Sequence, residues 1–573
     1  MNATGTEGTV SVAALSRAAH AAPSRRRFLL FWLILAAIWF GPLDTTRLFE
    51  PDEGRYAEIP REMVVSGDWV TPRLNAIKYF EKPALQYWAT AAAFELFGLH
   101  AWSARLWPAL CGFLGLLLTF GLGRALFDVR TALFAVLIQA GALLYLGLAR
   151  FATVDMSLCF GLQLALTALA LLARQRDPVR VPVETELPPW RLAALLGLGM
   201  AIAVLSKGLV GVLIPGAVAV LYLLWRRDWS LPLRARPWWS LGVLIVLCAP
   251  WFMLVSARNP EFAHFFFVVQ HFQRYLSTAG FDRYQPAWFF VPVLILGFLP
   301  WSTLLPGALM QAWRDARAGA HASAVLLVWT LFILIFFSAS QSKLIPYILP
   351  LVPALALLAA RYLTLLSAAD VGRHLAGVGA FAALVGLSLL LLGWLPPGAH
   401  LVAQASPASI ALLAAGFLLL ALATGLAAWL ARRLQLTDAV AAAALGCVLM
   451  AQCLLLAGER LPRFESIVQL EQRGQPWLGN STHFYCVDEY LQPLPFYWRR
   501  PCTLVGYRGE LDFGLKQEPW RWIADLPQFA SAWAQERDAL AILPPPVFRQ
   551  LSDLGLPMRV IYTSQSLVAV VRR

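Results

Sequence analysis

Residues 375–395 read LAGVGAFAALVGLSLLLLGWL, and this uninterrupted apolar stretch decides the class of fold. Residues 131–149 (TALFAVLIQAGALLYLGLA) have the same character. A helix of about 20 such residues crosses a lipid bilayer, and neither stretch offers a polar face to water. We therefore predict membrane-spanning helices, and not the buried helices of a large soluble protein.

The composition of the whole chain agrees with this prediction. Of its 573 residues, 59% are hydrophobic and 14% charged, whereas soluble proteins carry about 25% charged residues. The net charge is +13. No RNP motif or zinc-finger spacing accompanies that charge, so we expect no nucleic-acid partner and attribute it to the positive-inside rule, with membrane lipids as partners.

Hydropathy predicts about 13 spans, with the N-terminus inside and the C-terminus outside. Residues 1–24 are expected to form a disordered cytoplasmic tail, because Arg25, Arg26 and Arg27 precede an apolar run that resembles an uncleaved signal anchor. Every predicted inside loop is basic. The expected span cores are 28–43, 104–123, 131–149, 157–173, 192–206, 208–225, 239–255, 288–305, 324–339, 346–361, 375–395, 408–430 and 438–457.

This topology gives a transmembrane domain over 25–457 and a soluble outer domain over 458–573. In the outer domain, strand-like runs and one helix-like run, 526–535, predict a small α/β fold. The strand-like runs are 484–487, 503–505, 539–543, 558–563 and 567–571.

Two long outer loops, 44–103 and 256–287, are aromatic and mixed in charge. Within the first, 59–65 and 84–97 are typical of helices at a membrane surface. The outer side also has basic residues that the orientation rule does not require. They either reach lipid headgroups or line an anionic site: Arg55, Arg61, Lys82, Lys207, Arg258, Arg274 and Lys343.

Four outer strings carry candidate chemistry. They are Glu50-Pro51-Asp52-Glu53-Gly54-Arg55-Tyr56; Tyr79-Phe80-Glu81-Lys82-Pro83, followed by Tyr87-Trp88; Asp155 at the outer end of the fourth span; and Ser342-Lys343-Leu344-Ile345-Pro346-Tyr347-Ile348-Leu349-Pro350.

Together these strings resemble the GT-C glycosyltransferases that use polyprenyl-phosphate sugars, and most of all the lipid A 4-amino-4-deoxy-L-arabinose transferases of the protein O-mannosyltransferase-like superfamily. The resemblance covers the whole chain. It implies sugar transfer from an undecaprenyl-phosphate-linked donor to a phosphate of lipid A, at the periplasmic face of a bacterial inner membrane. It also implies lower lipid A charge, and so resistance to cationic peptides and polymyxin. No nucleotide cofactor is expected, since no phosphate-binding Gly-rich loop occurs.

Asp52 and Asp155 are the candidate catalytic residues, because carboxylates stabilise the positive charge that develops on a sugar ring. Each also precedes a helical run, where Asp is a preferred N-cap. A phosphate acceptor needs no deprotonation, so Asp52 would stabilise charge or orient the nucleophile; a hydroxyl acceptor would need a base.

The leaving group of such a reaction is a polyprenyl phosphate, which requires cations. The candidates are Lys82, Lys343 and Arg274, with Arg55 behind them. Tyr56 and Tyr347 could bond the phosphate or sugar, or could be ordinary interfacial aromatic residues.

Glu81, His264 and His271 share the outer compartment and suit a divalent metal such as zinc, as the resemblance also suggests. The alternative is plain amphipathic histidines. Cys486 and Cys502 are expected to form a disulfide, because the topology places both in an oxidising compartment; the alternative is two unpaired thiols in the domain core.

Two other functions stay open. One is a related transferase that moves mannose, galactosamine or another hexose to protein or lipid. The other is a lipid flippase or transporter, which charged residues deep in several spans would favour. The sequence indicates no oligomeric state.

Overall fold

The computed structural model describes residues 25–177, 187–273, 284–393 and 406–572. Its chain divides into two compact units, Met1–Pro42 and Leu43–Arg573. In the first, α2 (Arg25–Phe40) is an apolar helix that begins with the three arginines. The second unit holds the helical bundle and the C-terminal domain.

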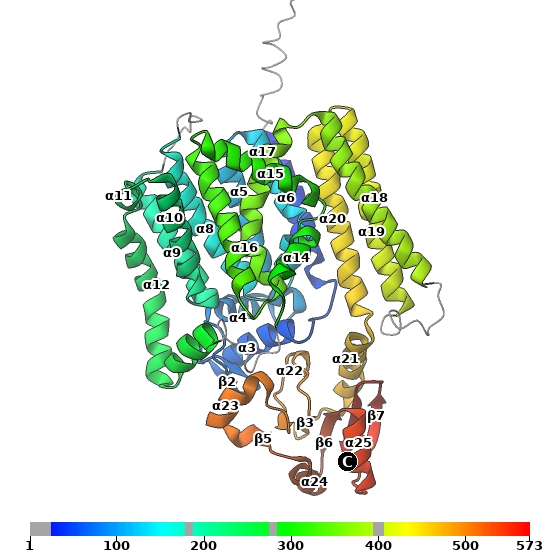
Figure 1. Ribbon diagram of the computed structural model, residues 1–573. Coiled ribbons are helices and arrows are strands. Elements are labelled where there is room, and N and C mark those ends of the chain that lie inside the picture. The colour runs from blue at the N-terminus through cyan, green and yellow to red at the C-terminus, as the bar shows by residue number, and fades with distance from the viewer. Residues whose placement is uncertain (1–24, 178–186, 274–283, 394–405, 573) are drawn as a thin grey trace, which may run out of the picture. The chain divides into compact units, whose positions relative to one another are not determined.

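The bundle is built from long apolar helices (Figure 1). Across the described residues of the whole chain, ten helices are long and apolar enough to cross a membrane, or twelve if each of two bent pairs is one span; Val210–Arg226 is a shorter apolar helix. The prediction of a polytopic α-helical membrane protein is thereby confirmed. The bundle helices are α5 (Ala101–Leu126), α6 (Val129–Ala140), α7 (Leu143–Ala149), α8 (Asp155–Arg174), α9 (Pro189–Lys207), α10 (Val210–Arg226), α12 (Pro237–Arg258), α14 (Phe290–Gly297), α15 (Leu305–Arg317), α16 (His321–Ala339), α17 (Val352–Leu365), α18 (Ala368–Gly393), α19 (Pro407–Arg432) and α20 (Leu436–Glu459).

The C-terminal domain is an α/β fold around one six-stranded sheet, as the sequence predicts. The strand order is β5-β4-β3-β6-β8-β7; β5, β4, β3 and β6 are parallel, and β8 pairs antiparallel with both β6 and β7. Every residue of β6 is buried, because apolar clusters cover both faces of the sheet. The strands are β3 (His483–Val487), β4 (Thr503–Val505), β5 (Trp522–Ile523), β6 (Ala539–Leu543), β7 (Arg559–Thr563) and β8 (Val568–Arg572); the helices are α21 (Pro462–Gly474), α22 (Pro493–Trp498), α23 (Asp512–Gln517), α24 (Leu526–Gln535) and α25 (Pro545–Asp553).

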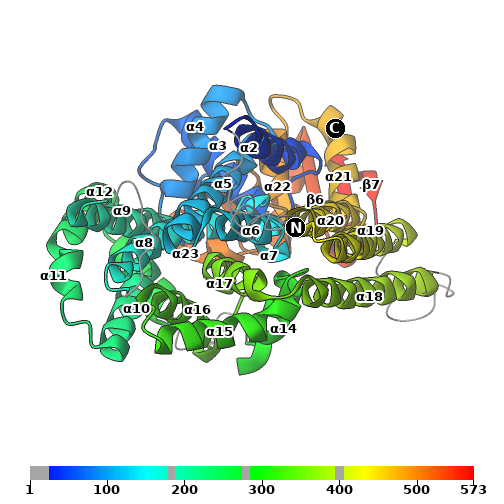
Figure 2. The same ribbon diagram turned by 90° about the horizontal axis from the view of Figure 1, so that it is seen from above.

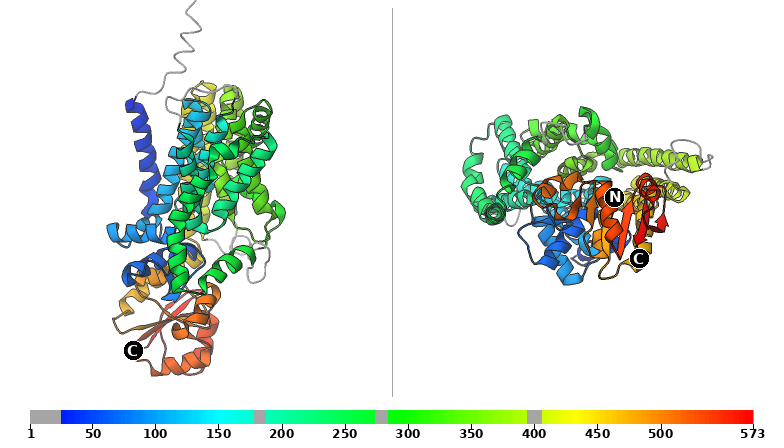
Figure 3. Two further views of the ribbon diagram at one scale, coloured as in Figure 1. Left: turned by 90° about the vertical axis from the view of Figure 1, so that its left-hand side faces the viewer. Right: turned by 90° about the horizontal axis from the view of Figure 1, so that it is seen from below.

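One end of the bundle carries this domain, and we refer to it as the domain end (Figures 1 and 3). The first long loop folds there into α3 (Asp52–Ser66), the hairpin β1–β2 (Arg73–Leu74 and Ile77–Lys78) and α4 (Leu85–Phe97). The helices predicted at 59–65 and 84–97 thus fall on α3 and α4.

The surface helices and the domain share one hydrophobic core, which contains Ile59 of α3, Tyr87 of α4 and Leu494 of α22. Gly54 allows the closest approach, since a Cβ at this position would stand 2.4 Å from the backbone nitrogen of Pro493. Asn75 adds a polar lock: its side chain donates to the Cys502 carbonyl at 2.8 Å and accepts from the Cys502 amide at 2.7 Å. The domain is therefore packed on the first loop and does not hang from a flexible tether.

Candidate active site

Asp52 and Arg55 face each other on the first turn of α3. The Asp52 carboxylate lies 3.6 Å from the Arg55 guanidinium, and the Asp52 side chain is 55% exposed. Pro51 occupies the N-cap position, and no side chain caps α3. Asp52 therefore does not serve as the helix cap, which leaves its carboxylate free to meet a ligand.

Arg55 is buried and held from two sides. Its guanidinium donates to the Tyr79 hydroxyl at 3.0 Å and to the Gln492 side-chain oxygen at 3.0 Å, and Glu510 lies 4.0 Å away. Gln492 and Glu510 belong to the C-terminal domain. The domain thus fixes a guanidinium that the sequence assigns to the site.

Glu53, the neighbour of Asp52, has a structural role. It is fully buried and forms a two-pronged ion pair with Arg105, each contact 2.7 Å. It also accepts from the Phe49 and Ala152 amides, both at 2.9 Å. These bonds tie the first loop to α5 and to the segment before α8, so Glu53 places its neighbours without facing the site.

Tyr56 lies in the electrostatic field of both candidate carboxylates. Burial raises the pKa of its hydroxyl; Tyr87, Asp52 and Asp155 raise it further, whereas Arg55 lowers it. Its ring stacks on Tyr87 with centroids 5.9 Å apart. The buried Tyr87 hydroxyl has no hydrogen-bond partner within the described chain, which is unusual for a buried polar group. The structure therefore gathers Asp52, Asp155 and two protonated tyrosines in one region.

Asp155 forms an ion pair with Lys207. The sequence predicts that this lysine lies on the outer side but predicts no partner for it. Lys207, at the end of α9, donates to the Asp155 carboxylate, and its ammonium lies 4.8 Å from the centroid of the Tyr347 ring. Val154 is the N-cap residue of α8, with no side-chain cap, so Asp155 is not a helix cap either. Three separate elements meet at this ion pair.

The remaining predicted cations lie in two places. The Lys82 ammonium is 2.9 Å from the Glu81 carbonyl and 3.9 Å from its carboxylate. Lys343 is buried and donates to the backbone carbonyls of Gln285, at 2.8 Å, and Ser340. That Lys82 and Lys343 serve one anionic cavity remains a prediction.

Two further outer arginines, for which the sequence leaves the role open, form ion pairs within the chain. Arg61 forms a two-pronged ion pair with Glu58, both contacts 2.6 Å, and Arg258 lies 3.2 Å from Asp68. The Arg61 ion pair is thus buried, whereas the Arg258 side chain is 56% exposed.

The proposed metal ligands are only partly visible. Arg274 and the side chain of His271 lie outside the described residues. His264 is exposed at the start of η2 (His264–Gln273), and the described residues contain no group of three or more His, Cys, Asp or Glu that could hold a metal. The described side chains thus do not assemble a metal site, and the binding of zinc stays an untested prediction.

The predicted disulfide is absent: Cys486 and Cys502 are both buried free thiols. Cys486 is opposite Leu504 in the β3–β4 register, and Cys502 precedes β4, so the two thiols are offset along adjacent strands. Burial raises the pKa of the Cys502 thiol, and a hydrogen bond with Cys486 raises it further. The pair belongs to the shared core, which was the alternative interpretation of these cysteines.

Sequence reasoning missed Gln492 and Glu510 completely, and it gave Lys207 no partner. Tyr79 and Tyr87 belong to the second outer string, but the residue pattern predicts no role for either hydroxyl. Only a known packing of the domain on α3 could have revealed the first two residues.

A helical membrane bundle with carboxylates, tyrosines and cations at one end, covered by an α/β domain, defines a glycosyltransferase of the GT-C class. The fold alone is shared with the oligosaccharyltransferase of Archaeoglobus fulgidus in its apo form, at TM-score 0.51 and 13% identity over 91% of this chain and 70% of that chain. Family models agree: residues 24–266 match dolichyl-phosphate-mannose-protein mannosyltransferase, and residues 470–572 match the aminoarabinose transferase C-terminal domain.

The chain belongs to the aminoarabinose transferase (ArnT) family. ArnT from Cupriavidus metallidurans, solved with bound undecaprenyl phosphate, is 35% identical, with TM-score 0.86 over 96% of this chain and 98% of that chain. Curated relatives named undecaprenyl phosphate-alpha-4-amino-4-deoxy-L-arabinose arabinosyl transferase are 36% identical over 334 residues in Aeromonas salmonicida (strain A449) and 37% over 342 residues in Pseudomonas aeruginosa (strain LESB58). These alignments span 58% of this chain and 58% and 59% of the respective relatives.

Proposed function

We propose that this protein transfers 4-amino-4-deoxy-L-arabinose from undecaprenyl phosphate to a phosphate of lipid A. The observation that carries the proposal is the presence of two carboxylate–cation pairs at the domain end, Asp52 with Arg55 and Asp155 with Lys207. The names of the curated relatives support the sugar and its carrier, and the ArnT structure with undecaprenyl phosphate supports the carrier lipid.

The proposed reaction needs no net proton transfer. The bond between the sugar C1 and the oxygen of undecaprenyl phosphate breaks, and its electron pair stays on that phosphate. An oxygen of the lipid A phosphate forms the new bond to C1. Positive charge develops on the ring between these events, and the exposed Asp52 carboxylate is suited to stabilise it.

The phosphates bring negative charge to a region whose described cations are already partly paired. Arg55 is beside Asp52, and Lys207 is bonded to Asp155. Lys82, Lys343 and Arg274 remain our candidates for the leaving phosphate, since Lys supplies a point charge and Arg can bind two phosphate oxygens. Protonated Tyr56 and Tyr87 can donate to the same oxygens.

We further propose that the domain end faces the periplasm and that the membrane is a bacterial inner membrane. The loops at the opposite end are basic, as expected of a cytoplasmic face. Lipid A and the lipid-linked donor would both reach the site from the membrane. The product would carry less negative charge than its substrate, which would weaken binding of cationic peptides.

Mass spectrometry of lipid A separates this function from the alternatives. Cells with the wild-type protein should show lipid A with added aminoarabinose, and cells with the Asp52→Asn variant at equal membrane abundance should not. A glycoprotein with unmodified lipid A would favour the related hexose transferases. Transport of an unmodified lipid, with no new glycoside, would favour a flippase.

A further inference from the structure

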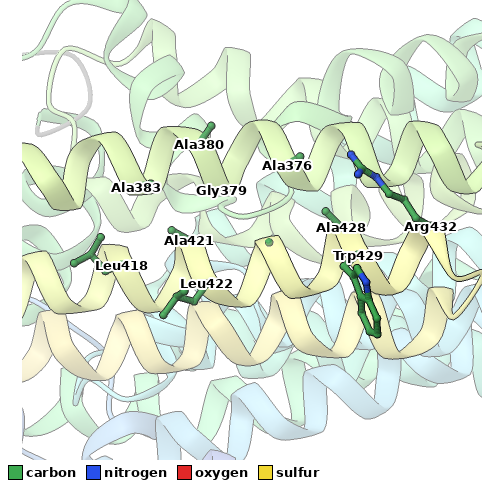
Figure 4. Close-up of a pocket in the computed structure, with 11 residues that line it drawn as sticks. Ala376, Gly379, Ala380, Ala383, Leu418, Ala421, Leu422, Ala428, Trp429 and Arg432 are labelled. Atoms are coloured by element: carbon green, nitrogen blue, oxygen red, sulfur yellow. The ribbon is translucent and has the colours of Figure 1, made fainter.

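A groove runs between α18 and α19, far from the candidate site. Its volume is about 640 Å³, and its walls consist mainly of alanine, glycine and leucine (Figure 4). Figure 2 shows α18, α19 and α20 side by side at one edge of the bundle. The lining residues are Ala376, Gly379, Ala380, Ala383, Leu418, Ala421, Leu422, Gly425, Ala428, Trp429 and Arg432.

Two glycines show how the groove forms. At Gly379 the helices nearly touch, because a Cβ there would stand 2.9 Å from the Thr424 hydroxyl. At Gly425 the surroundings are open, with nothing within 4 Å of an added Cβ. Small residues thus let α18 and α19 approach closely at Gly379, and they leave the space beside Gly425 free of side chains.

One end of the groove is cationic. Arg432 is the last residue of α19, at the end of the bundle opposite the domain, since α20 runs from there to α21 and the domain. Its side chain crosses toward α18 (Figure 4), and a Cβ at Gly372 would be 3.6 Å from its Cγ. Arg432 is exposed, and within the described chain it has no hydrogen bond or ion pair.

The dimensions of the groove suit an acyl chain. Leu418 and Arg432 are fourteen residues apart on one helix, which is about 21 Å at 1.5 Å per residue. The hydrocarbon core of a bilayer is about 30 Å thick. A chain that lies in the groove would therefore cover one leaflet and reach past the midplane, with its headgroup at Arg432 and Trp429.

We propose that this groove binds a phospholipid with an anionic headgroup, its acyl chain along the small residues and its phosphate on Arg432. An arginine can bind two phosphate oxygens at once, and interfacial tryptophan favours the headgroup level. Small-residue grooves also pack against helices of a second copy. A helix from a second copy would cover the apolar walls but leave the Arg432 guanidinium without an anion. The positive charge of Arg432 therefore favours an anionic lipid over a second copy.

The test uses the purified full-length protein in detergent, titrated with dioleoyl phosphatidylglycerol or dioleoyl phosphatidylcholine. Native mass spectrometry counts bound lipids, and thermal unfolding reports stabilisation. Phosphatidylglycerol should bind more tightly and raise Tm more. Arg432→Gln should weaken phosphatidylglycerol binding about tenfold, the scale of one lost hydrogen bond to a charged group, and bring it close to that of phosphatidylcholine.

Two matched controls separate the groove from general surface charge. Gly425→Leu fills the groove and should reduce binding of both lipids. Gly377→Leu is the control, since Gly377 also has nothing within 4 Å of an added Cβ but does not line the groove. Arg124→Gln removes the same charge from an exposed position in the last turn of α5, which does not line the groove, and should leave the lipid preference unchanged.

Three results would overturn the proposal. One is equal binding of the two lipids by the wild-type protein. Another is an equal loss in Arg432→Gln and Arg124→Gln, which would indicate only a diffuse surface charge. The third is a wild-type dimer that Gly425→Leu converts to a monomer with lipid binding unchanged, which would assign the groove to a second copy of the chain.

Discussion

Adjacent acidic residues in this protein have opposite fates. The Asp52 side chain is largely exposed and does not cap α3, whereas Glu53 is fully buried against Arg105. Both residues belong to the Glu50–Tyr56 string, and residue type alone would make either carboxylate a candidate catalytic group. Only the direction of each side chain from the first turn of α3 separates a residue that can meet substrate from one that holds the fold.

Asp52→Asn should therefore abolish transfer while the protein still folds. Loss of one group that stabilises transition-state charge costs on the order of 100-fold in rate. Lipid A modification and membrane abundance measure the two effects. The contrasting variant is Glu53→Gln, which leaves Arg105 without its buried partner at a cost of about 3–5 kcal/mol and should reduce abundance. Normal modification by a well-expressed Asp52→Asn protein would contradict the assignment.

Glu62 provides a pH-dependent prediction. Burial raises the pKa of its carboxyl, and the nearby Glu58 raises it further. The folded state then holds the proton more tightly than the unfolded state, so this carboxyl stabilises the fold at low pH and costs stability as pH rises above the ordinary glutamate range.

Glu62→Gln should consequently reduce the loss of unfolding free energy between about pH 5 and pH 8, by up to about 1.4 kcal/mol for each unit by which the pKa is raised. The fall in Tm over this range should become shallower. Thermal unfolding of the purified protein across this range measures it. Glu95→Gln changes an exposed glutamate of α4 and should not alter the slope. Identical pH profiles for wild type and Glu62→Gln would refute the prediction.

At the scale of elements, α22 reaches the candidate site through a single side chain. Gln492, its N-cap residue, accepts from Arg55 at 3.0 Å and donates to Glu510. Gln492 is a positioning residue, since it acts through the guanidinium. The α22 backbone packs on Gly54 without that side chain, so the contact between α3 and α22 should survive its loss.

Gln492→Leu should lower kcat/KM about tenfold, the scale of one hydrogen bond to a charged group, with Tm nearly unchanged. Assays with varied donor concentration and thermal unfolding separate the two. Gln517→Leu, at an exposed position of α23, is the matched control. An equal drop in activity in both variants, or a large fall in Tm in Gln492→Leu alone, would mean that Gln492 only stabilises the domain.

Elements with strong periodicity were predictable, and contacts between distant elements were not. The runs at 539–543 and 526–535 coincide with β6 and α24. Strand β5 has only two residues, Trp522 and Ile523, too few for an alternating pattern. The cysteines show a related limit: a compartment can favour a bond, but the sequence does not record that Cys486 and Cys502 lie as free thiols in the core that the domain shares with α3 and α4.

For the whole molecule, the hydropathy pattern predicted the class of fold and the end at which the candidate residues gather. Asp52 and Tyr56 share α3, whereas Asp155 and Tyr347 come from distant parts of the chain, yet the alternation of spans brings all four to the domain end. It could not show that the C-terminal domain shares a core with α3 and α4. That contact depends on complementary surfaces about 430 residues apart, such as Asn75 against Cys502, and no local pattern records them.

The orientation of the whole molecule in the membrane can be measured by cysteine labelling. The bundle separates exposed Ser531 in the C-terminal domain from exposed Arg373 near the start of α18, at the opposite end. If the domain end faces the periplasm, a membrane-impermeant maleimide should label Ser531→Cys in cells with a permeabilised outer membrane. Arg373→Cys should react only after the inner membrane is broken. The native cysteines contribute little background, since six of the seven are buried and Cys453 is only partly exposed. Labelling of Arg373→Cys alone in unbroken cells would invert the topology and place the candidate active site on the cytoplasmic side.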